Sequence, residues 1–414
     1  MSNPTDKGKA HYISPRLLKN LDSQTPISKF YTQATYMNRR TEPQSIDLSL
    51  GDAYEMPPPG FVEALQHWVV PQNSSWYGYK ANLSESQLIV STSLKEKRGL
   101  SILSEDILMT NGTAVGLAIC LRMLAQEGDE VIILTPPWLG YRNMINLTGA
   151  TAVGVPVNTN TFDMDLEAIA SAITQRTRAL IVNSPHNPTG KIFSTATLER
   201  LAAILTEASH RYGNPIYIIS DESFSRVVFD HQACPSPTQF YPFSFLVYGY
   251  SKTLMAPGQR IGYIALPSIM PNREQIKRVI GFLQRNAFGW CYPSVLMQYA
   301  LGDLEQLNIN MEHLQTKRDL TVKALRDMGY KLHSPDGTFF LLVQAPWKDD
   351  CSFAELLASH NVFVFPGTPL EIPGYFRISL TATEDMLSRA LPKFQAALKY
   401  AGEKSFRDTN SDLQ

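Results

Sequence analysis

Short apolar runs alternate with longer amphipathic stretches through the first three quarters of this sequence. Clusters of β-branched and aromatic residues predict strands, and apolar residues that recur every three or four positions predict helices. The expected strands cover residues 107–110, 131–134, 151–157, 179–182, 216–220, 245–250 and 261–266. The expected helices cover residues 113–127, 165–172, 194–211 and 271–282, and Ser194 is the expected N-cap of the third. This alternation predicts an α/β fold with a mostly parallel sheet wrapped by helices.

The pattern changes after residue 303. A long charged helical stretch over residues 304–328 precedes the short apolar segments GTFFLLV and NVFVF, and a helix over residues 383–401 follows. This texture is typical of a second, α+β domain. The predicted division has an N-terminal segment that joins the smaller domain (1–45), a large domain (46–303), a small C-terminal domain (304–402) and a disordered tail (403–414).

Charge and cysteine usage narrow the class of function. Lys and Arg number 37 against 38 Asp and Glu, so no bulk positive charge would draw the chain to nucleic acid or to anionic lipid. The four cysteines are widely spaced, which argues against a metal site and indicates free thiols. The polar N-terminus and the absence of a long apolar run predict a cytoplasmic protein outside the membrane. Small-molecule chemistry is therefore the favoured class.

Polar segments follow four of the expected strands. NSPHNPTG follows residues 179–182, DESF follows 216–220, SKTLMAPGQR follows 245–250, and TPPWLGY follows 131–134. In open parallel sheets, ligands bind outside the carboxyl ends of the strands. These four segments are therefore expected to form one site.

Taken in this order, the segments resemble the class I and II aminotransferases of the aspartate aminotransferase superfamily. These are fold type I enzymes that use pyridoxal 5′-phosphate (PLP), and the resemblance spans about residues 46–400. It implies a seven-stranded-type sheet in the large domain and a homodimer with shared active sites. It also implies transfer of an amino group from an L-amino acid to a 2-oxo acid.

The resemblance assigns the reacting groups. Lys252, in S-K-T-x-x-x-P-G-x-R-I-G-Y, matches the lysine that forms a Schiff base with the cofactor aldehyde. An amine suits this role because its pKa falls readily when it is desolvated or lies near other cations. Asp221 follows a strand directly, where a carboxylate is a fitting partner for a protonated pyridine nitrogen. Asn187, in N-P-T-G, matches the asparagine that binds the phenolic oxygen of the cofactor and lies beside the substrate.

A phosphate site is expected where NGTA opens the helix after residues 107–110. Gly112, Thr113 and Ala114 would present free backbone N–H groups there. In the family pattern Ser251 and Arg260 complete the anion site, and the guanidinium contributes paired hydrogen bonds.

The remaining site residues also follow from the resemblance. Trp138 matches the aromatic residue that stacks on the pyridine ring, and Gly51 matches a glycine whose backbone lies close to the substrate. Arg377, in Y-F-R-I-S-L, matches the arginine that binds the substrate α-carboxylate, a bidentate task for which Lys is a poor substitute. Tyr77 matches the tyrosine that reaches the cofactor phosphate of the neighbouring subunit, and Tyr79 is a rival for that place.

Two positions depart from the family pattern. The D-E-x-Y tyrosine is Phe224 here, so Asn187 is expected to be the sole donor to the phenolic oxygen. The phosphate-binding Ser or Thr three residues before Lys252 is Gly249, so one phosphate contact is expected to be missing or to come from elsewhere. Because of these departures, a PLP-dependent lyase, cyclase or decarboxylase on the same scaffold stays open as an alternative.

Two further hypotheses concern partners and substrate. A PLP-dependent regulator would carry a basic DNA-binding domain before the PLP domain, and the polar N-terminal segment leaves no room for one. The aromatic-rich stretch 284–294 is expected near the pocket in this family, which favours an aromatic or large polar amino acid over a dicarboxylate.

Overall fold

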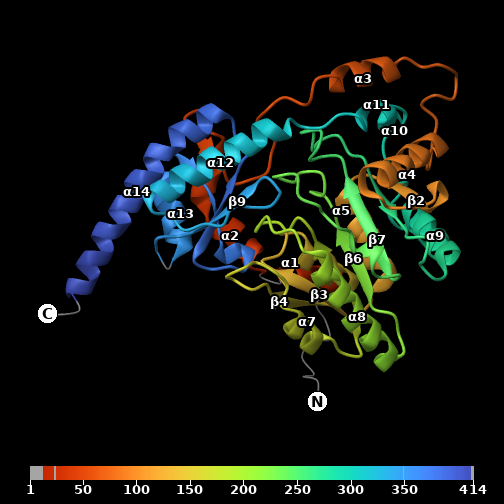
Figure 1. The fold of residues 1–414 in the computed structure, drawn as a ribbon, viewed down its shortest axis with the longest axis horizontal. Coiled ribbons are helices and arrows are strands. Elements are labelled where there is room, and N and C mark those ends of the chain that lie inside the picture. The colour runs from red at the N-terminus through yellow and green to blue at the C-terminus, as the bar shows by residue number, and fades with distance from the viewer. Residues whose placement is uncertain (1–12, 23–24, 348, 412–414) are drawn as a thin grey trace.

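The computed structural model of the protein describes residues 13–22, 25–347 and 349–411. A seven-stranded sheet with its helices forms the larger part of the molecule, and a group of shorter strands with long helices lies beside it (Figure 1). The C-terminal quarter of the chain supplies most of this second group.

The large sheet is the predicted one. Its strands are β2 (Ile107–Thr110), β3 (Glu130–Thr135), β4 (Thr151–Pro156), β5 (Thr177–Asn183), β6 (Tyr217–Asp221), β7 (Ser244–Gly249) and β8 (Gly262–Ala265). Their order is β2-β8-β7-β6-β5-β3-β4. Only β8 runs antiparallel to its neighbours, and the other pairs are parallel. The prediction of a mostly parallel sheet wrapped by helices is confirmed.

Both faces of the sheet are buried except at the edge strand β4, which explains why the other strands read as continuous apolar runs. In β3, Ile132 and Leu134 belong to the core under α7 (Leu166–Ala172) and α8 (Thr195–Tyr212). Val131 and Ile133 point to the other face. That face packs against α5 (Thr113–Leu124), α6 (Tyr141–Thr148) and α9 (Arg273–Phe282). A further core beneath α3 (Phe61–Val69), α4 (Ser84–Arg98), α10 (Val295–Tyr299) and α11 (Leu301–Leu304) covers the β2 edge.

The second group is built around a three-stranded antiparallel sheet. Its order is β11 (Phe365–Pro366), β12 (Tyr375–Ser379) and β9 (Phe340–Gln344). Beside it β1 (Ile46–Asp47) pairs in parallel with β10 (Val362–Phe363). The helices of this group are α12 (Met311–Met328), α13 (Asp350–Ser359) and α14 (Glu384–Ser411). Residues at the start and the end of the chain therefore share one layer.

The N-terminal helices link the two groups. The helix α2 (Pro26–Gln33) contacts η6 (Thr368–Leu370), and η2 (Thr35–Thr41) contacts β10. The first helix, α1 (Pro15–Asp22), contacts α6 of the large sheet. The shorter elements are η3 (Ser104–Asp106), η4 (Pro237–Gln239) and the π-helix η5 (Leu283–Ala287). The predicted domain boundaries stay a prediction.

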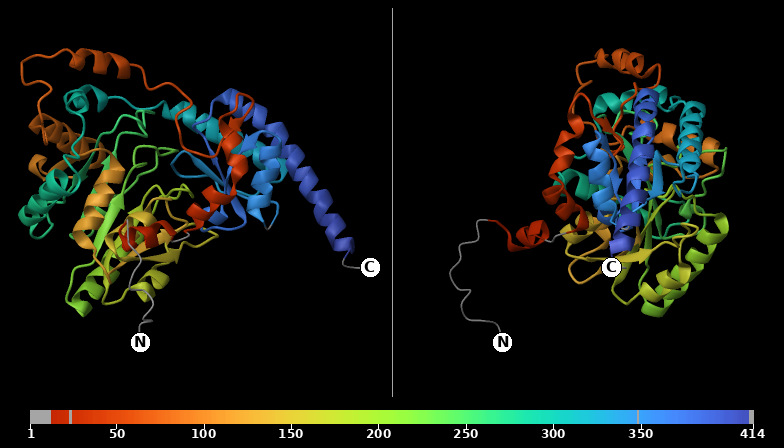
Figure 2. Two further views of the ribbon diagram at one scale, coloured as in Figure 1. Left: turned by 180° about the vertical axis from the view of Figure 1, so that it is seen from behind. Right: turned by 90° about the vertical axis from the view of Figure 1, so that its left-hand side faces the viewer.

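The last helix is longer than the helix predicted over residues 383–401. The helix α14 continues through Gly402 as far as Ser411 and projects beyond the body (Figures 1 and 2). A glycine costs a helix about 1 kcal/mol, and the good helix formers Glu403, Lys404 and Arg407 follow it. Residues 412–414 lie outside the described residues. The residue types therefore allow the helix to continue beyond its predicted end.

The caps set other helix boundaries. Ser194 caps α8 as predicted, since its hydroxyl accepts from the N–H of Thr197. The helix expected over 304–328 begins instead at Met311, where the side chain of Asn310 accepts from the N–H of His313. All four cysteines are free. In the part of the chain that the structure describes, no helix has the length and apolar character needed to cross a membrane.

Candidate active site

A cavity of about 270 Å³ lies at the carboxyl ends of the parallel strands. Strands β5, β6 and β7 lead into it, and β9 and β12 of the second group contribute residues from the other side. Ten predicted site residues line it together: Gly51, Thr113, Ala114, Trp138, Asn187, Asp221, Ser251, Lys252, Arg260 and Arg377. The segments after the strands therefore do meet in one cavity, as expected. The role of each residue stays a prediction.

Asp221 is the last residue of β6 and is 5% exposed. Its Oδ1 accepts hydrogen bonds from the backbone N–H (3.1 Å) and the hydroxyl (2.6 Å) of Ser223. Its Oδ2 accepts from the phenol of Tyr141 at 2.6 Å. Burial raises the pKa of this carboxyl, and the hydrogen bonds oppose that rise. All three donors are neutral, so they stabilise the negative charge without cancelling it.

The sequence interpretation missed Tyr141. It is the first residue of α6 and lies three residues after Trp138, whose ring it contacts edge-on at 5.3 Å between centroids. The segment TPPWLGY contains both residues, and the backbone N–H of Tyr141 donates to the Trp138 carbonyl at 3.1 Å in the turn before α6. Only the tertiary structure shows that the phenol reaches the end of β6.

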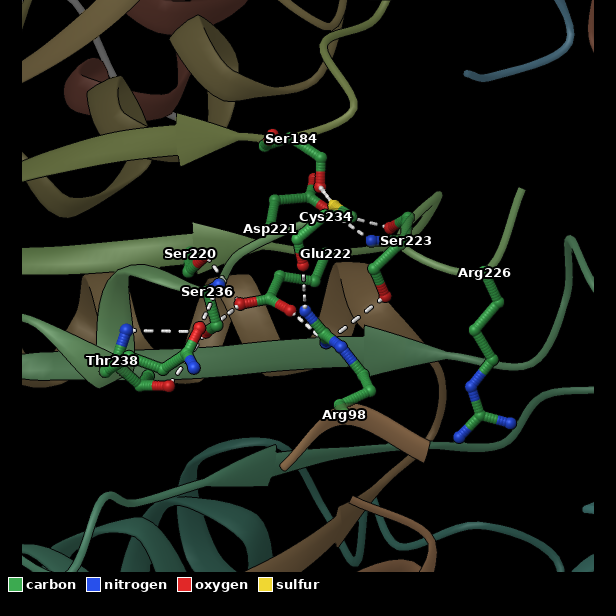
Figure 3. Close-up of polar contacts among 12 residues, drawn as sticks. Arg98, Ser184, Ser220, Asp221, Glu222, Ser223, Arg226, Cys234, Ser236 and Thr238 are labelled. Atoms are coloured by element: carbon green, nitrogen blue, oxygen red, sulfur yellow. Dashed lines mark hydrogen bonds and ion pairs between the residues drawn. The ribbon is translucent and has the colours of Figure 1, made fainter. Parts of the chain in front are cut away.

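The next residue in the chain carries a second buried carboxylate. Glu222 is 1% exposed and forms an ion pair with Arg98 of α4, as Figure 3 shows. Its other oxygen accepts hydrogen bonds from Ser220 (2.9 Å) and Ser236 (2.5 Å). A buried charge is tolerated where an opposite charge and hydrogen bonds compensate it. The negative charge of Glu222 is thus compensated by the positive charge of Arg98, whereas Asp221 has only neutral hydrogen-bond donors.

Lys252 enters the cavity from the turn after β7. Its ammonium lies 5.6 Å from the centre of the Phe224 ring. Burial lowers the pKa of Lys252 to about 8, helped by the positive charges of Arg377 and Arg260. The carboxylates of Asp52 and Asp221 oppose this shift. A neutral, nucleophilic amine is therefore accessible near neutral pH.

The start of α5 and Arg260 form an anion cradle. Gly112 has a φ of 84°, and a side chain there would collide with the guanidinium of Arg260. That position therefore needs glycine both for its backbone and for space. Arg260 donates to the hydroxyl of Ser251 at 2.9 Å. The N–H groups of Thr113 and Ala114 lie in the first turn of α5, where the helix dipole favours an anion.

The structure accounts for Gly249, one of the two departures from the family pattern. A Cβ built on Gly249 would lie 3.0 Å from the backbone nitrogen of Thr113 and would collide with its hydroxyl oxygen. A serine or threonine at residue 249 therefore does not fit. The Thr113 hydroxyl occupies that space, so it is the group that can supply the missing contact.

Arg377 reaches the cavity from β12. One of its terminal nitrogens donates to the carbonyl of Ser49 (2.8 Å), and the other donates to Oδ1 of Asn187 (3.3 Å). Its guanidinium lies over the Phe340 ring at 4.0 Å. Burial lowers its pKa to about 10, so it stays cationic at neutral pH. Its Nε is buried and has no partner in the described part of the chain, so this N–H remains for an anion in the cavity.

The walls between these groups are mostly aromatic and tight. Because Oδ1 of Asn187 accepts from Arg377, its amide nitrogen is the donor that can face a ligand. Phe224 packs edge-to-face on Phe339 (5.4 Å) and Phe340 (6.0 Å), so no phenol lies at that place. A Cβ on Gly51 would lie 2.8 Å from the Phe340 ring and 3.9 Å from Nζ of Lys252. Gly51 therefore lets the chain pass close to the lysine.

Tyr77 is not brought to this cavity by its own chain. It is 54% exposed, and its phenol donates to the carbonyl of Val69. Tyr79 is 87% exposed and lies 5.2 Å from the Trp290 ring. None of residues 284–294 lines the cavity either. The inference of an aromatic substrate thus has no support from the lining of this chain and stays a prediction.

Comparison with known proteins agrees with this geometry. The profile of the family described as "Aminotransferase class I and II" matches residues 44–394. An aspartate/prephenate aminotransferase of Thermus thermophilus is 30% identical over 356 residues, which are 82% of this chain and 88% of that protein.

Solved structures give the same result for the fold. An aminotransferase from Eubacterium rectale has a TM-score of 0.87 and 26% identity, covering 95% of this chain and 100% of that one. The Thermus thermophilus aspartate aminotransferase crystallised with maleate has a TM-score of 0.82 and 27% identity, covering 94% of this chain and 100% of that one.

Proposed function

Because this chain belongs to the class I and II aminotransferase family, and so is an aminotransferase acting on an amino acid and a 2-oxo acid, we propose that it holds PLP at Lys252. The observation that carries the proposal is the meeting of Lys252, Asp221 and Arg377 in one cavity with the start of α5.

The residues present fit this cofactor. The phosphate fits the cradle of Gly112, Thr113, Ala114, Ser251 and Arg260, where a Cβ at residue 112 would fill the space. The pyridine nitrogen fits the buried carboxylate of Asp221, which has only neutral donors. Trp138 then provides an aromatic wall for the ring, and the amide of Asn187 provides a donor for its phenolic oxygen.

When bound, PLP supplies an aldehyde that captures an amine and a cationic ring that withdraws electrons. The chain supplies the rest of the chemistry. Lys252 would hold the cofactor through its Nζ, and the same amine would carry the α-proton of the substrate when it is not bound to the cofactor. The unpaired Nε of Arg377, with its neighbouring nitrogen, binds the α-carboxylate. Asp221 keeps the proton on the ring nitrogen.

The half-reaction with an amino donor tests the function. Incubation of the holoenzyme with a panel of L-amino acids, without an acceptor, is expected to give pyridoxamine phosphate and the matching 2-oxo acid. Adding 2-oxoglutarate or pyruvate should restore the long-wavelength absorbance. Release of CO₂ or of an eliminated group, with no pyridoxamine phosphate from any donor, would instead support the lyase, cyclase or decarboxylase alternative. The observation behind this alternative is Phe224, which stands where the family pattern has a tyrosine and packs on Phe339.

The lowered pKa of Lys252 gives a pH prediction for capture of the cofactor. Only the neutral amine attacks an aldehyde, and its fraction rises as pH increases toward the pKa of about 8. The rate at which the PLP-free protein captures PLP should rise about tenfold per pH unit below pH 8 and level off above it. Stopped-flow absorbance between pH 6 and 9.5 measures this. Continued rise to pH 10 would place the amine at its ordinary pKa.

We also propose a homodimer with shared active sites. Its support is Tyr77, which the family pattern sends to a neighbouring phosphate and which is exposed here beside the exposed Val69 and Val70. Tyr77→Phe is expected to weaken PLP binding about tenfold, since a hydrogen bond to a charged group is lost.

Hybrids test the sharing of sites. A mixture of Tyr77→Phe and Lys252→Ala protomers should regain activity, because one of the two sites in a hybrid dimer is then intact. Full activity of a monomer, checked by sedimentation at micromolar concentration, would rule the shared site out.

A further inference from the structure

We propose that Tyr141 is a positioning residue that keeps Asp221 ionised and the ring nitrogen of the cofactor protonated. This inference rests on the proposed function, because it concerns the partner of the PLP ring. It adds a residue that the sequence motifs did not indicate.

The geometry isolates one donor. The Tyr141 phenol lies 2.6 Å from Oδ2 of Asp221, and the tyrosine is 3% exposed. Its ring packs edge-on against Trp138. The phenol holds the carboxylate from the α6 side, and Ser223 holds Oδ1 from the loop after β6. Both oxygens are thereby fixed, and Oδ2, which accepts one bond where Oδ1 accepts two, keeps acceptor capacity for a ligand.

The charge balance makes this bond matter. A proton shared between a ring nitrogen and a buried carboxylate can sit on either partner, giving a charged pair or a neutral pair. Burial raises the pKa of Asp221 and so favours the neutral pair. The Tyr141 phenol donates to the carboxylate and stabilises the charged pair more than the neutral pair, because a hydrogen bond to an ionised acceptor is the stronger one. Its hydrogen bond therefore moves the proton toward the ring, where it makes the ring an electron sink.

The other charged groups near Asp221 do not supply this effect. Glu222, the adjacent residue, opposes ionisation of Asp221 by its own charge. Arg98 is engaged by an ion pair with Glu222 (Figure 3). Lys252 is a cation in the cavity, but the proposed linkage to PLP consumes its amine. The neutral donors Tyr141 and Ser223 are thus left to hold the negative charge.

The ring nitrogen itself reports the result. The enzyme is loaded with PLP labelled with ¹⁵N in the ring, and the ¹⁵N chemical shift is recorded for wild type and Tyr141→Phe. The variant keeps the aromatic packing and removes only the donor. We expect its shift to move toward that of an unprotonated ring. We also expect kcat to fall about tenfold, as for loss of a hydrogen bond to a charged group, with KM for the amino donor within about twofold.

Two variants serve as matched controls. Tyr241→Phe removes another buried phenol, which lies outside the site and donates to the Ile216 carbonyl at 2.8 Å. This variant should leave the ¹⁵N shift and kcat unchanged. Ser223→Ala removes the hydroxyl donor to Oδ1 but keeps the backbone donor, so the shift should move in the same direction by less. This second variant also keeps the test decisive if Tyr141→Phe does not fold.

The proposal is overturned if Asp221→Asn moves the ¹⁵N shift from its wild-type value and Tyr141→Phe does not. If Asp221→Asn also leaves the shift unchanged, the assignment of Asp221 in the proposed function fails first and this proposal falls with it. The two failures are therefore distinguishable in one series of spectra.

Discussion

Lys252→Ala is expected to lower turnover at least about 1000-fold, because the variant loses both the nucleophile and the group that carries the α-proton. PLP should still bind through the phosphate cradle of Gly112 and Arg260, but without a covalent bond. After borohydride treatment, acid denaturation and mass spectrometry should find the cofactor attached to Lys252 in the wild type and released in the variant.

Lys252→Arg is the matched control for this experiment. It keeps a positive charge in the cavity but cannot form the covalent bond, so it separates the chemistry of the amine from its electrostatics. Cofactor attached to another lysine, or turnover within tenfold of wild type in either variant, would show that Lys252 is not the anchoring residue.

Asp221→Ala is expected to lower turnover by roughly 100-fold or more, a loss typical when a buried group that stabilises developing charge is removed. The cofactor should remain bound through its phosphate and through Lys252. Turnover falls because the ring nitrogen loses the carboxylate that holds its proton. Steady-state rates, together with the absorbance of bound PLP, measure both parts of this prediction.

Asp221→Asn is a control for damage to the fold. Asp221→Asn preserves the shape and a hydrogen bond to Tyr141 while removing the charge, so it should lose as much activity as Asp221→Ala. Unfolding midpoints equal to that of the wild type in both variants would exclude collapse of the network around Glu222 and Arg98. Near-wild-type turnover in Asp221→Asn would refute the assigned role.

Much of this architecture was readable from the sequence because its causes are local. Period and composition located the seven strands of the large sheet, since six of them are buried on both faces and must be apolar, and the edge strand β4 is rich in β-branched residues. Strand ends in parallel sheets meet at one edge, so NSPHNPTG, DESF and SKTLMAPGQR could be assigned to one site before their distances were known. The glycine at residue 112 was likewise visible as a helix start after a strand.

Other features depended on how distant segments pack. Tyr141 and Asp221 are 80 residues apart, and Arg377 and Asn187 are 190 apart, so no local pattern reports their hydrogen bonds. The replacement of a serine or threonine by Gly249 looked like a lost contact. The structure instead shows the Thr113 hydroxyl in that space.

The sequence by itself determined the fold class and the residue types of the site, because hydrophobic periodicity and turn chemistry are properties of neighbouring residues. The tertiary structure decided which of these side chains meet. It placed Tyr77 outside the cavity of its own chain and left the Nε of Arg377 as a buried donor with no partner among the described residues. The pKa values of Lys252 and Asp221 were decided there too, since desolvation and nearby charges depend on what folds around a group and not on what precedes it in the chain.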